Sequence, residues 1–170
     1  MAEEFQDQKK VRKAQSVVPR NKLKEKAGSG GVDDKVVARA QGLIEHNNID
    51  FTPLAFELVG TLQKTIKEAQ SGAITGEDAI SAILYPAMQL RAQGGMFHYP
   101  LITDISDILI NFMETVTVID KEVLEIVEAH KKSIRHVLTK KMRGDGGMVG
   151  KELCSALMDS CKRYYKARMT

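Results

Sequence analysis

The chain has 170 residues, of which 43% are hydrophobic, 28% are charged and 5% are aromatic. These proportions are typical of a globular protein, and the length suits one domain with a tail. No apolar stretch approaches the roughly 20 residues that a membrane-spanning helix needs, so membrane insertion is not expected. The first residues also lack the charged-then-apolar pattern of a signal peptide, and we therefore expect a soluble, cytoplasmic protein.

The formal net charge of +3 is concentrated near the N-terminus. Residues 1–30 contain eight Lys or Arg and four Asp or Glu, whereas the other 140 residues contain 17 and 18. A charged tail with so few apolar residues is predicted to be disordered, and the glycines and serine of 28–31 to form a flexible hinge. The predicted division is a disordered basic tail and hinge over 1–31 and a helical domain over 32–170.

From Asp33 onward, apolar residues recur at helical spacing and predict six amphipathic helices. Capping residues and prolines indicate where each helix begins. The predicted starts, in chain order, are a cap at Asp33 or Asp34, a cap at Thr52 before Pro53, a capping box at Thr75-Gly76-Glu77-Asp78, Tyr99-Pro100, a cap at Asp120, and the neighbourhood of Val149.

Few aromatic residues and no tryptophan leave aliphatic side chains and eight methionines to fill the core. This composition favours helices packed on helices over a sheet sandwich. The predicted fold class is all-α, as an antiparallel four-helix bundle with one or two additional packed helices.

Residues that commonly carry chemistry are poorly placed for it. His130 and His136 are six residues apart and point to opposite sides of one helix, so they cannot chelate one metal. Cys154 and Cys161 are seven apart, about 10 Å along a helix, which is too far for a disulfide and predicts two structural thiols. The glycine-rich stretch 144–150 lacks a phosphate-binding motif and is interpreted as a loop between helices. We therefore expect no metal, no cofactor and no enzymatic activity.

The most distinctive segment is 88–102, with the sequence Met-Gln-Leu-Arg-Ala-Gln-Gly-Gly-Met-Phe-His-Tyr-Pro-Leu-Ile. It resembles the helical hairpin of histidine phosphotransfer (Hpt) domains, and most closely a helical subfamily of alphaproteobacterial signalling proteins. The resemblance covers roughly residues 28–165. Aligned on Leu90, the correspondences are Met88 for the phosphorylatable histidine, Arg91 for a lysine, Ala92 for a glycine, Gln93-Gly94 for a small-residue pair, Phe97 for a turn hydrophobe, His98 for a usual glycine, and Met113-Glu114 for the closing pair.

This resemblance implies an Hpt-like bundle that has lost its phosphate acceptor, because a methionine has no nucleophilic nitrogen. Arg91 retains the positive charge in a form that suits carboxylate or phosphate. The implied function is a protein-interaction module of two-component phosphorelay signalling in bacteria that works without phosphorylation and docks a receiver domain or a histidine kinase. The expected partner-binding residues are Met88, Gln89, Arg91, Ala92, Gln93, Gly95 and His98.

Three alternatives remain open at the level of sequence. Met88 is a core residue in the first, since methionine at helical spacing is usually buried. In the second, the chain is an active phosphotransfer protein that uses a relocated histidine, either His98 or His130. The third is a structural or assembly protein whose basic tail binds an acidic partner or nucleic acid, although no base-reading motif supports nucleic-acid recognition.

Overall fold

The computed structural model describes residues 22–27, 33–45 and 50–168. These residues form seven α-helices and one short 3-10 helix and include no strand, which confirms the predicted all-α fold class. Within the same ranges, no helix combines the length and the apolarity needed to cross a membrane. The described residues divide into two units, with the boundary between Gly42 and Leu43.

The first unit contains α1 (Lys22–Ala27) and most of α2 (Asp34–Glu45). Asp33 caps α2 as predicted, because its carboxylate accepts a hydrogen bond from the backbone N–H of Lys35 at 3.0 Å. Apolar residues of this helix are exposed, at 56% for Val36 and 73% for Leu43. Most of the basic tail, and His46, lie outside the described residues.

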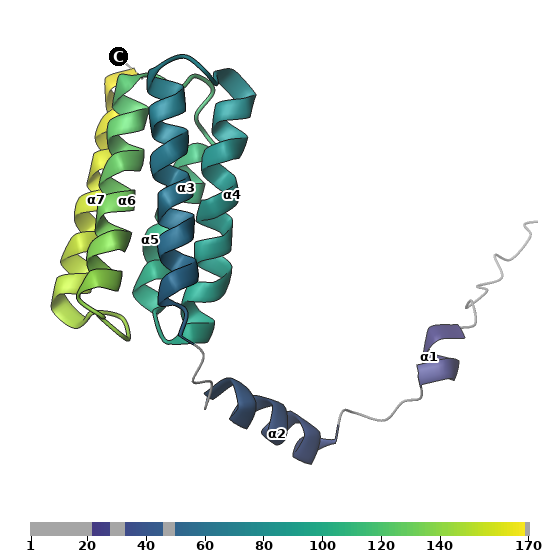
Figure 1. Cartoon of the computed structure of the whole chain (residues 1–170). Helices are drawn as coiled ribbons and strands as arrows, with labels where there is room; N and C mark the ends of the chain where they lie inside the picture. Colours follow the sequence, from purple (N-terminus) through teal and green to yellow (C-terminus); the bar gives the residue numbers. More distant parts are fainter. Residues whose placement is uncertain (1–21, 28–32, 46–49, 169–170) are drawn as a thin grey trace, which may run out of the picture. The chain divides into compact units, whose positions relative to one another are not determined.

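The second unit contains five long helices that run side by side (Figure 1). They are α3 (Thr52–Gln70), α4 (Gly76–Gly94), α5 (Pro100–Met113), α6 (Lys121–Thr139) and α7 (Gly147–Arg168), with the 3-10 helix η1 (Gly95–Phe97) between α4 and α5. Helix α3 contacts α4 and α6, while α5 contacts α4, α6 and α7. Helix α7 also contacts α6, so it packs on a cycle formed by α3, α4, α5 and α6.

The sequence predicted where the helices start more accurately than which side chains cap them. Asp120 caps α6 as expected, accepting from the N–H of Val123 at 2.9 Å. Thr75 is the N-cap of α4, but its side chain makes no capping hydrogen bond, so the predicted capping box is not formed. Thr52 is not a cap either, because the helix already includes it and the carboxylate of Asp50 accepts from its N–H at 3.0 Å.

Aliphatic side chains fill the core between the helices, as the composition predicted. Leu62, Ile83, Leu109 and Ile134 come from four different helices and are fully buried. Helix α7 adds an aromatic contact, since Phe112 of α5 lies 5.2 Å from Tyr164 between ring centroids in an edge-on arrangement. Burial of this kind is the dominant stabilising term for a helical protein of this size.

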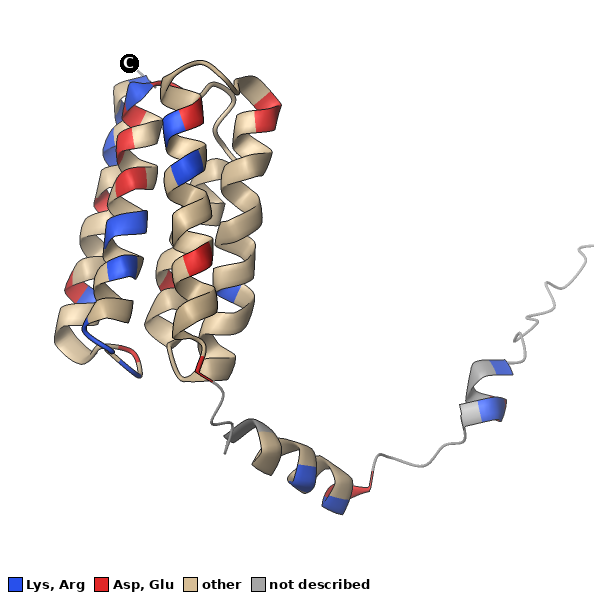
Figure 2. Ribbon diagram, in the orientation of Figure 1, with Lys and Arg blue, Asp and Glu red and all other residues tan. Residues whose placement is uncertain are grey.

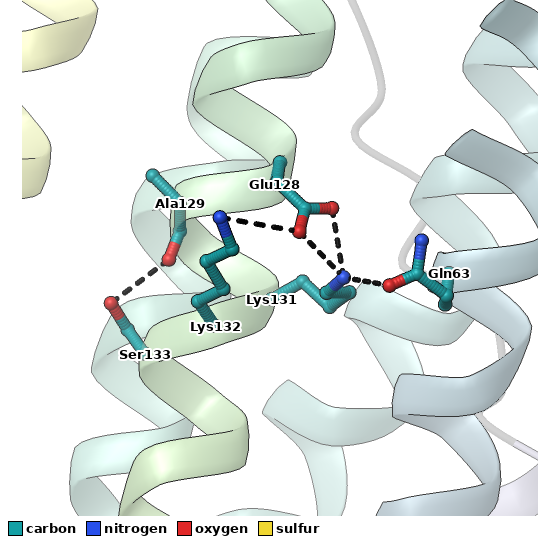
Figure 3. A network of polar contacts seen from close by, with 6 residues as sticks. All are labelled: Gln63, Glu128, Ala129, Lys131, Lys132 and Ser133. Carbon is teal, nitrogen blue, oxygen red and sulfur yellow. Dashed lines mark hydrogen bonds and ion pairs between the residues drawn. The ribbon is translucent and has the colours of Figure 1, made fainter. Parts of the chain in front are cut away.

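One charged side chain interrupts this apolar interior. Lys131 of α6 is only 3% exposed, and its amine donates hydrogen bonds to Gln63 of α3 and, at 2.8 Å, to Glu128 (Figure 3). Glu128 also lies 3.6 Å from the exposed Lys132. The buried amine therefore depends on one carboxylate and one amide, and it joins α6 to α3 by a polar contact.

Candidate functional site

The outer side of α4 carries several of the residues that the sequence predicted to bind a partner. Its first turn contains Glu77 and Asp78, its last turn contains Arg91, and no charged residue lies between them. Met88 lies in this uncharged stretch and is 51% exposed. The alternative that Met88 is a core residue is therefore wrong.

The structure brings three of the predicted residues onto one exposed stripe. Met88, Ala92 and Gly95 are spaced by four and three residues and are all exposed, which places them along one side of the helix. Gln89 and Gln93 form a half-buried stripe next to it, where the amide of Gln93 donates to Gln89 at 3.1 Å.

Sequence reasoning missed two members of the same stripe. Tyr85 is 63% exposed, and Ser81, one turn earlier, is exposed as well. Ser81 lies four residues before Tyr85, and Tyr85 lies three residues before Met88, so helical spacing was the available signal. The motif considered in the sequence starts only at Met88 and therefore does not include them. We call the stripe formed by Ser81, Tyr85, Met88, Ala92 and Gly95 the α4 face.

Arg91 lies beside the α4 face and is held by α5. Its Nε is 2.9 Å from the carboxylate of Asp107, and both side chains are about half exposed. The hydroxyl of Thr103 accepts from the N–H of Gly95 at 2.9 Å and donates to the carbonyl of Arg91 at 3.1 Å. These contacts from α5 fix the end of α4, so Arg91 presents its charge from an ordered backbone.

Gly94 has a different role from the one expected. As part of the small-residue pair Gln93-Gly94, it was expected at an open surface, but Gly94 is buried against α5. A Cβ atom at this position would lie 2.8 Å from the Thr103 hydroxyl and 2.9 Å from the carbonyl oxygen of Tyr99. Gly94 therefore permits close packing within the chain, and only Gly95 is open to a partner.

His98 is exposed and has a left-handed backbone conformation, with φ of 66°. Its N–H donates to Gly95 at 3.3 Å, and its carbonyl accepts from the N–H of Gly144 at 3.0 Å. The first bond closes the turn that contains η1, and the second joins this turn to the loop before α7. A left-handed conformation is unfavourable for residues with a Cβ atom, so glycine would fit this position with less backbone strain than histidine.

We expect the substitution His98→Gly to raise the free energy of unfolding by about 0.5–1 kcal/mol, because glycine relieves the strained backbone and only part of that gain is lost to chain entropy. Urea denaturation followed by circular dichroism would measure the change. The matched control is His136→Gly at an exposed position in the last turn of α6, which is expected to lower stability because glycine is a poor helix former. A His98→Gly protein less stable than the parent would contradict the prediction.

His130 is fully buried, which separates it from the other candidate histidine. Its Nδ1 lies 2.8 Å from the carbonyl oxygen of Ile126 one turn earlier, and only a protonated Nδ1 makes that hydrogen bond. Its Nε2 has no hydrogen-bond partner among the residues that the structure describes. Burial lowers the pKa of His130 below its usual 6.5, and the bond to Ile126 opposes that shift. A side chain enclosed in this way is out of reach of a partner's aspartate.

Because the folded pKa of His130 is lower than the unfolded one, the unfolded chain binds more protons between the two values. We therefore expect the free energy of unfolding to be at its full value above about pH 7, and to fall as pH decreases through 6.5 toward the folded pKa. Urea denaturation between about pH 7.5 and 5.5 would measure this slope.

The variant His130→Leu should flatten that slope, while His136→Gln, at an exposed position of the same helix, should leave it in place. An unchanged slope in His130→Leu would assign the pH dependence to other groups.

The two cysteines are free, with Cys161 buried and Cys154 half-buried. Burial raises the pKa of the Cys161 thiol to about 11, so it remains protonated and unreactive at neutral pH. In the described part of the chain, no three His, Cys, Asp or Glu residues come close enough together to hold a metal ion. The exposed α4 face, flanked by Arg91, is therefore the best candidate for a functional site.

Comparisons with protein-family models, with curated proteins and with solved structures give no match for this chain. The assignment of a function therefore depends on the α4 face and on the residues around it.

Proposed function

We propose that this protein is a phosphorylation-independent interaction module of bacterial two-component signalling, and that it docks a receiver domain or a histidine kinase through the α4 face. The observation that carries the proposal is the exposure of Met88 at the centre of this face. A phosphotransfer helix needs a nucleophilic nitrogen there, and methionine supplies an apolar, polarisable contact instead.

The surroundings of Met88 support docking without group transfer. Tyr85 and Ala92 extend the exposed apolar surface by one turn on each side, and Arg91 supplies a positive charge at its edge. An apolar centre with an arginine at the rim is a common composition for a protein-binding surface. Phosphotransfer through His98 is the second candidate, because His98 is exposed whereas His130 is buried.

The first test restores the missing nucleophile. If a receiver domain docks on the α4 face, the variant Met88→His should accept acid-labile phosphate from a phosphorylated receiver, while the parent remains unlabelled. Candidate receivers are those encoded in the same genome. If the parent protein were labelled and the variant His98→Gln were not, the result would favour phosphotransfer through His98. If no receiver labelled Met88→His, the result would count against docking at this face.

The second test measures docking directly. We expect Arg91→Glu to weaken the binding of a receiver by roughly tenfold or more, because the charge at the rim of the contact is reversed. Isothermal titration with the unphosphorylated receiver gives the dissociation constant. The control is Arg135→Glu, a charge reversal at an exposed position of α6, which should leave binding unchanged. Equal weakening by both variants would point to non-specific electrostatic attraction.

A further inference from the structure

The α4 face has the residue spacing of a helix-packing seam. Ser81, Tyr85, Met88, Ala92 and Gly95 follow one another at intervals of four, three, four and three residues. This is the spacing of the contact positions in coiled coils, where a second helix packs along the stripe. Three of the five residues are small, which allows a second helix backbone to approach closely. The shape and spacing of the face therefore suit a helix as the occupant.

The charges of α4 indicate how such a helix would be oriented. Glu77 and Asp78 lie in its first turn and Arg91 in its last turn, with an uncharged stretch between them (Figure 2). Glu77 and Arg91 are both exposed and are 14 residues apart, so they occupy equivalent positions two heptads apart on the same flank of the seam. Two copies of α4 in antiparallel orientation would place Arg91 of each beside Glu77 of the other. A parallel pair would place these two flanks on opposite sides of the seam and leave the charges unpaired.

We propose that the α4 face binds the α4 face of a second copy of this chain, antiparallel and related by a two-fold axis. Such an interface is self-complementary, since each stripe supplies the same apolar residues and each pair of ends supplies opposite charges. Each copy keeps its own Arg91–Asp107 contact, because a guanidinium has donors left for a second carboxylate.

One helix pair forms a small interface, so the association is weak, with a dissociation constant on the order of 100 µM. The proposal of self-association does not require that a receiver binds the face. If a receiver does bind, the second copy competes with it, and docking is favoured when the protein is dilute.

Sedimentation equilibrium of the full chain over a range of concentrations tests the proposal. We expect a monomer–dimer equilibrium, and we expect Tyr85→Glu to abolish the dimer because it places a charge in the centre of the seam. The variant Glu125→Lys, which changes charge at an exposed position of α6, is the control and should leave the equilibrium unchanged. A chain that stays monomeric at about 1 mM, or a dimer that survives Tyr85→Glu, would overturn the proposal.

A charge exchange tests the antiparallel arrangement. Arg91→Glu and Glu77→Arg should each weaken the dimer at least about fivefold, and the double variant Glu77→Arg/Arg91→Glu should restore it. Failure of the double variant to recover would contradict the antiparallel contact. Receiver binding is measured separately by titration of dilute protein, so loss of the dimer and loss of docking are distinguishable results.

Discussion

The substitution Gly150→Ala is expected to destabilise the protein by roughly 3 kcal/mol. Gly150 lies in the first turns of α7 and is buried under the loop that precedes the helix. A Cβ atom there would lie 2.0 Å from the carbonyl oxygen of Asp145 and 3.3 Å from the side chain of Leu101. Because the nearest obstacle is backbone, relief requires the loop that carries Asp145 to move away from the first turn of α7.

The expected movement has a second consequence. The same loop holds the N–H of Gly144 against the carbonyl of His98 at 3.0 Å, so Gly150→Ala should also loosen the turn that follows α4. Hydrogen exchange at Gly144 would report this change, and thermal denaturation would report the loss of stability. If the stability of Gly150→Ala were unchanged, the loop would be able to move at no cost in free energy, and the prediction would be wrong.

The matched control is Gly60→Ala in α3. Gly60 is exposed within a helix, and a Cβ atom there would meet nothing within 4 Å. The alanine should therefore raise the free energy of unfolding by about 0.5–1 kcal/mol, because alanine is the better helix former. The two glycine substitutions are thus expected to change the free energy of unfolding in opposite directions. This difference distinguishes the effect of a close backbone contact from a general effect of replacing glycine.

The second large effect is expected at the buried amine of Lys131. Lys131 is 3% exposed, and Figure 3 shows its amine bonded to Gln63 and Glu128. Replacing Glu128 with alanine leaves Gln63 as the remaining one of these two partners. Breaking one side of a buried ion pair typically costs 3–5 kcal/mol, and because the Glu128 side chain is 26% exposed we expect about 2–3 kcal/mol. Urea denaturation of Glu128→Ala would measure the loss.

Removing the buried charge itself should be much less harmful. Lys131→Met keeps most of the side-chain volume, and Glu128 retains Lys132 at 3.6 Å, so the expected change is within about 1 kcal/mol of the parent. Glu125→Ala, at an exposed position of the same helix, should change stability by less than about 0.5 kcal/mol. If Lys131→Met were as destabilising as Glu128→Ala, the amine would be stabilising the fold rather than being tolerated by it.

The helical class and most helix starts were predictable from the sequence because their causes are local. Asp33 and Asp120 cap their helices through bonds to N–H groups two and three residues away, and Pro100 begins α5 as its fixed backbone angle requires. The unformed caps at Thr52 and Thr75 show the limit of this reasoning. A hydroxyl is a candidate cap in the sequence, but in the structure the carboxylate of Asp50 bonds to the N–H of Thr52, and the Thr75 hydroxyl makes no capping bond.

The candidate site was predicted in part. Residue spacing placed Met88 and Ala92 on one side of a helix, but spacing does not tell which side is buried, so the exposure of Met88 and Tyr85 required the packed bundle. The role of Gly94 depends on the carbonyl of Tyr99 and the hydroxyl of Thr103, which only the packing of α4 on α5 brings close. The ion pair between Arg91 and Asp107 also forms only because α4 packs on α5.

The sequence by itself determined that this chain is helical and that its basic charge lies in the N-terminal segment, and it placed Met88 within the helix that starts near Thr75. The tertiary structure alone decided that His130 is enclosed, that Lys131 is buried on Gln63 and Glu128, and that the uncharged side of α4 remains open. Periodicity and capping act over one or two helical turns, whereas burial depends on which faces of separate helices meet.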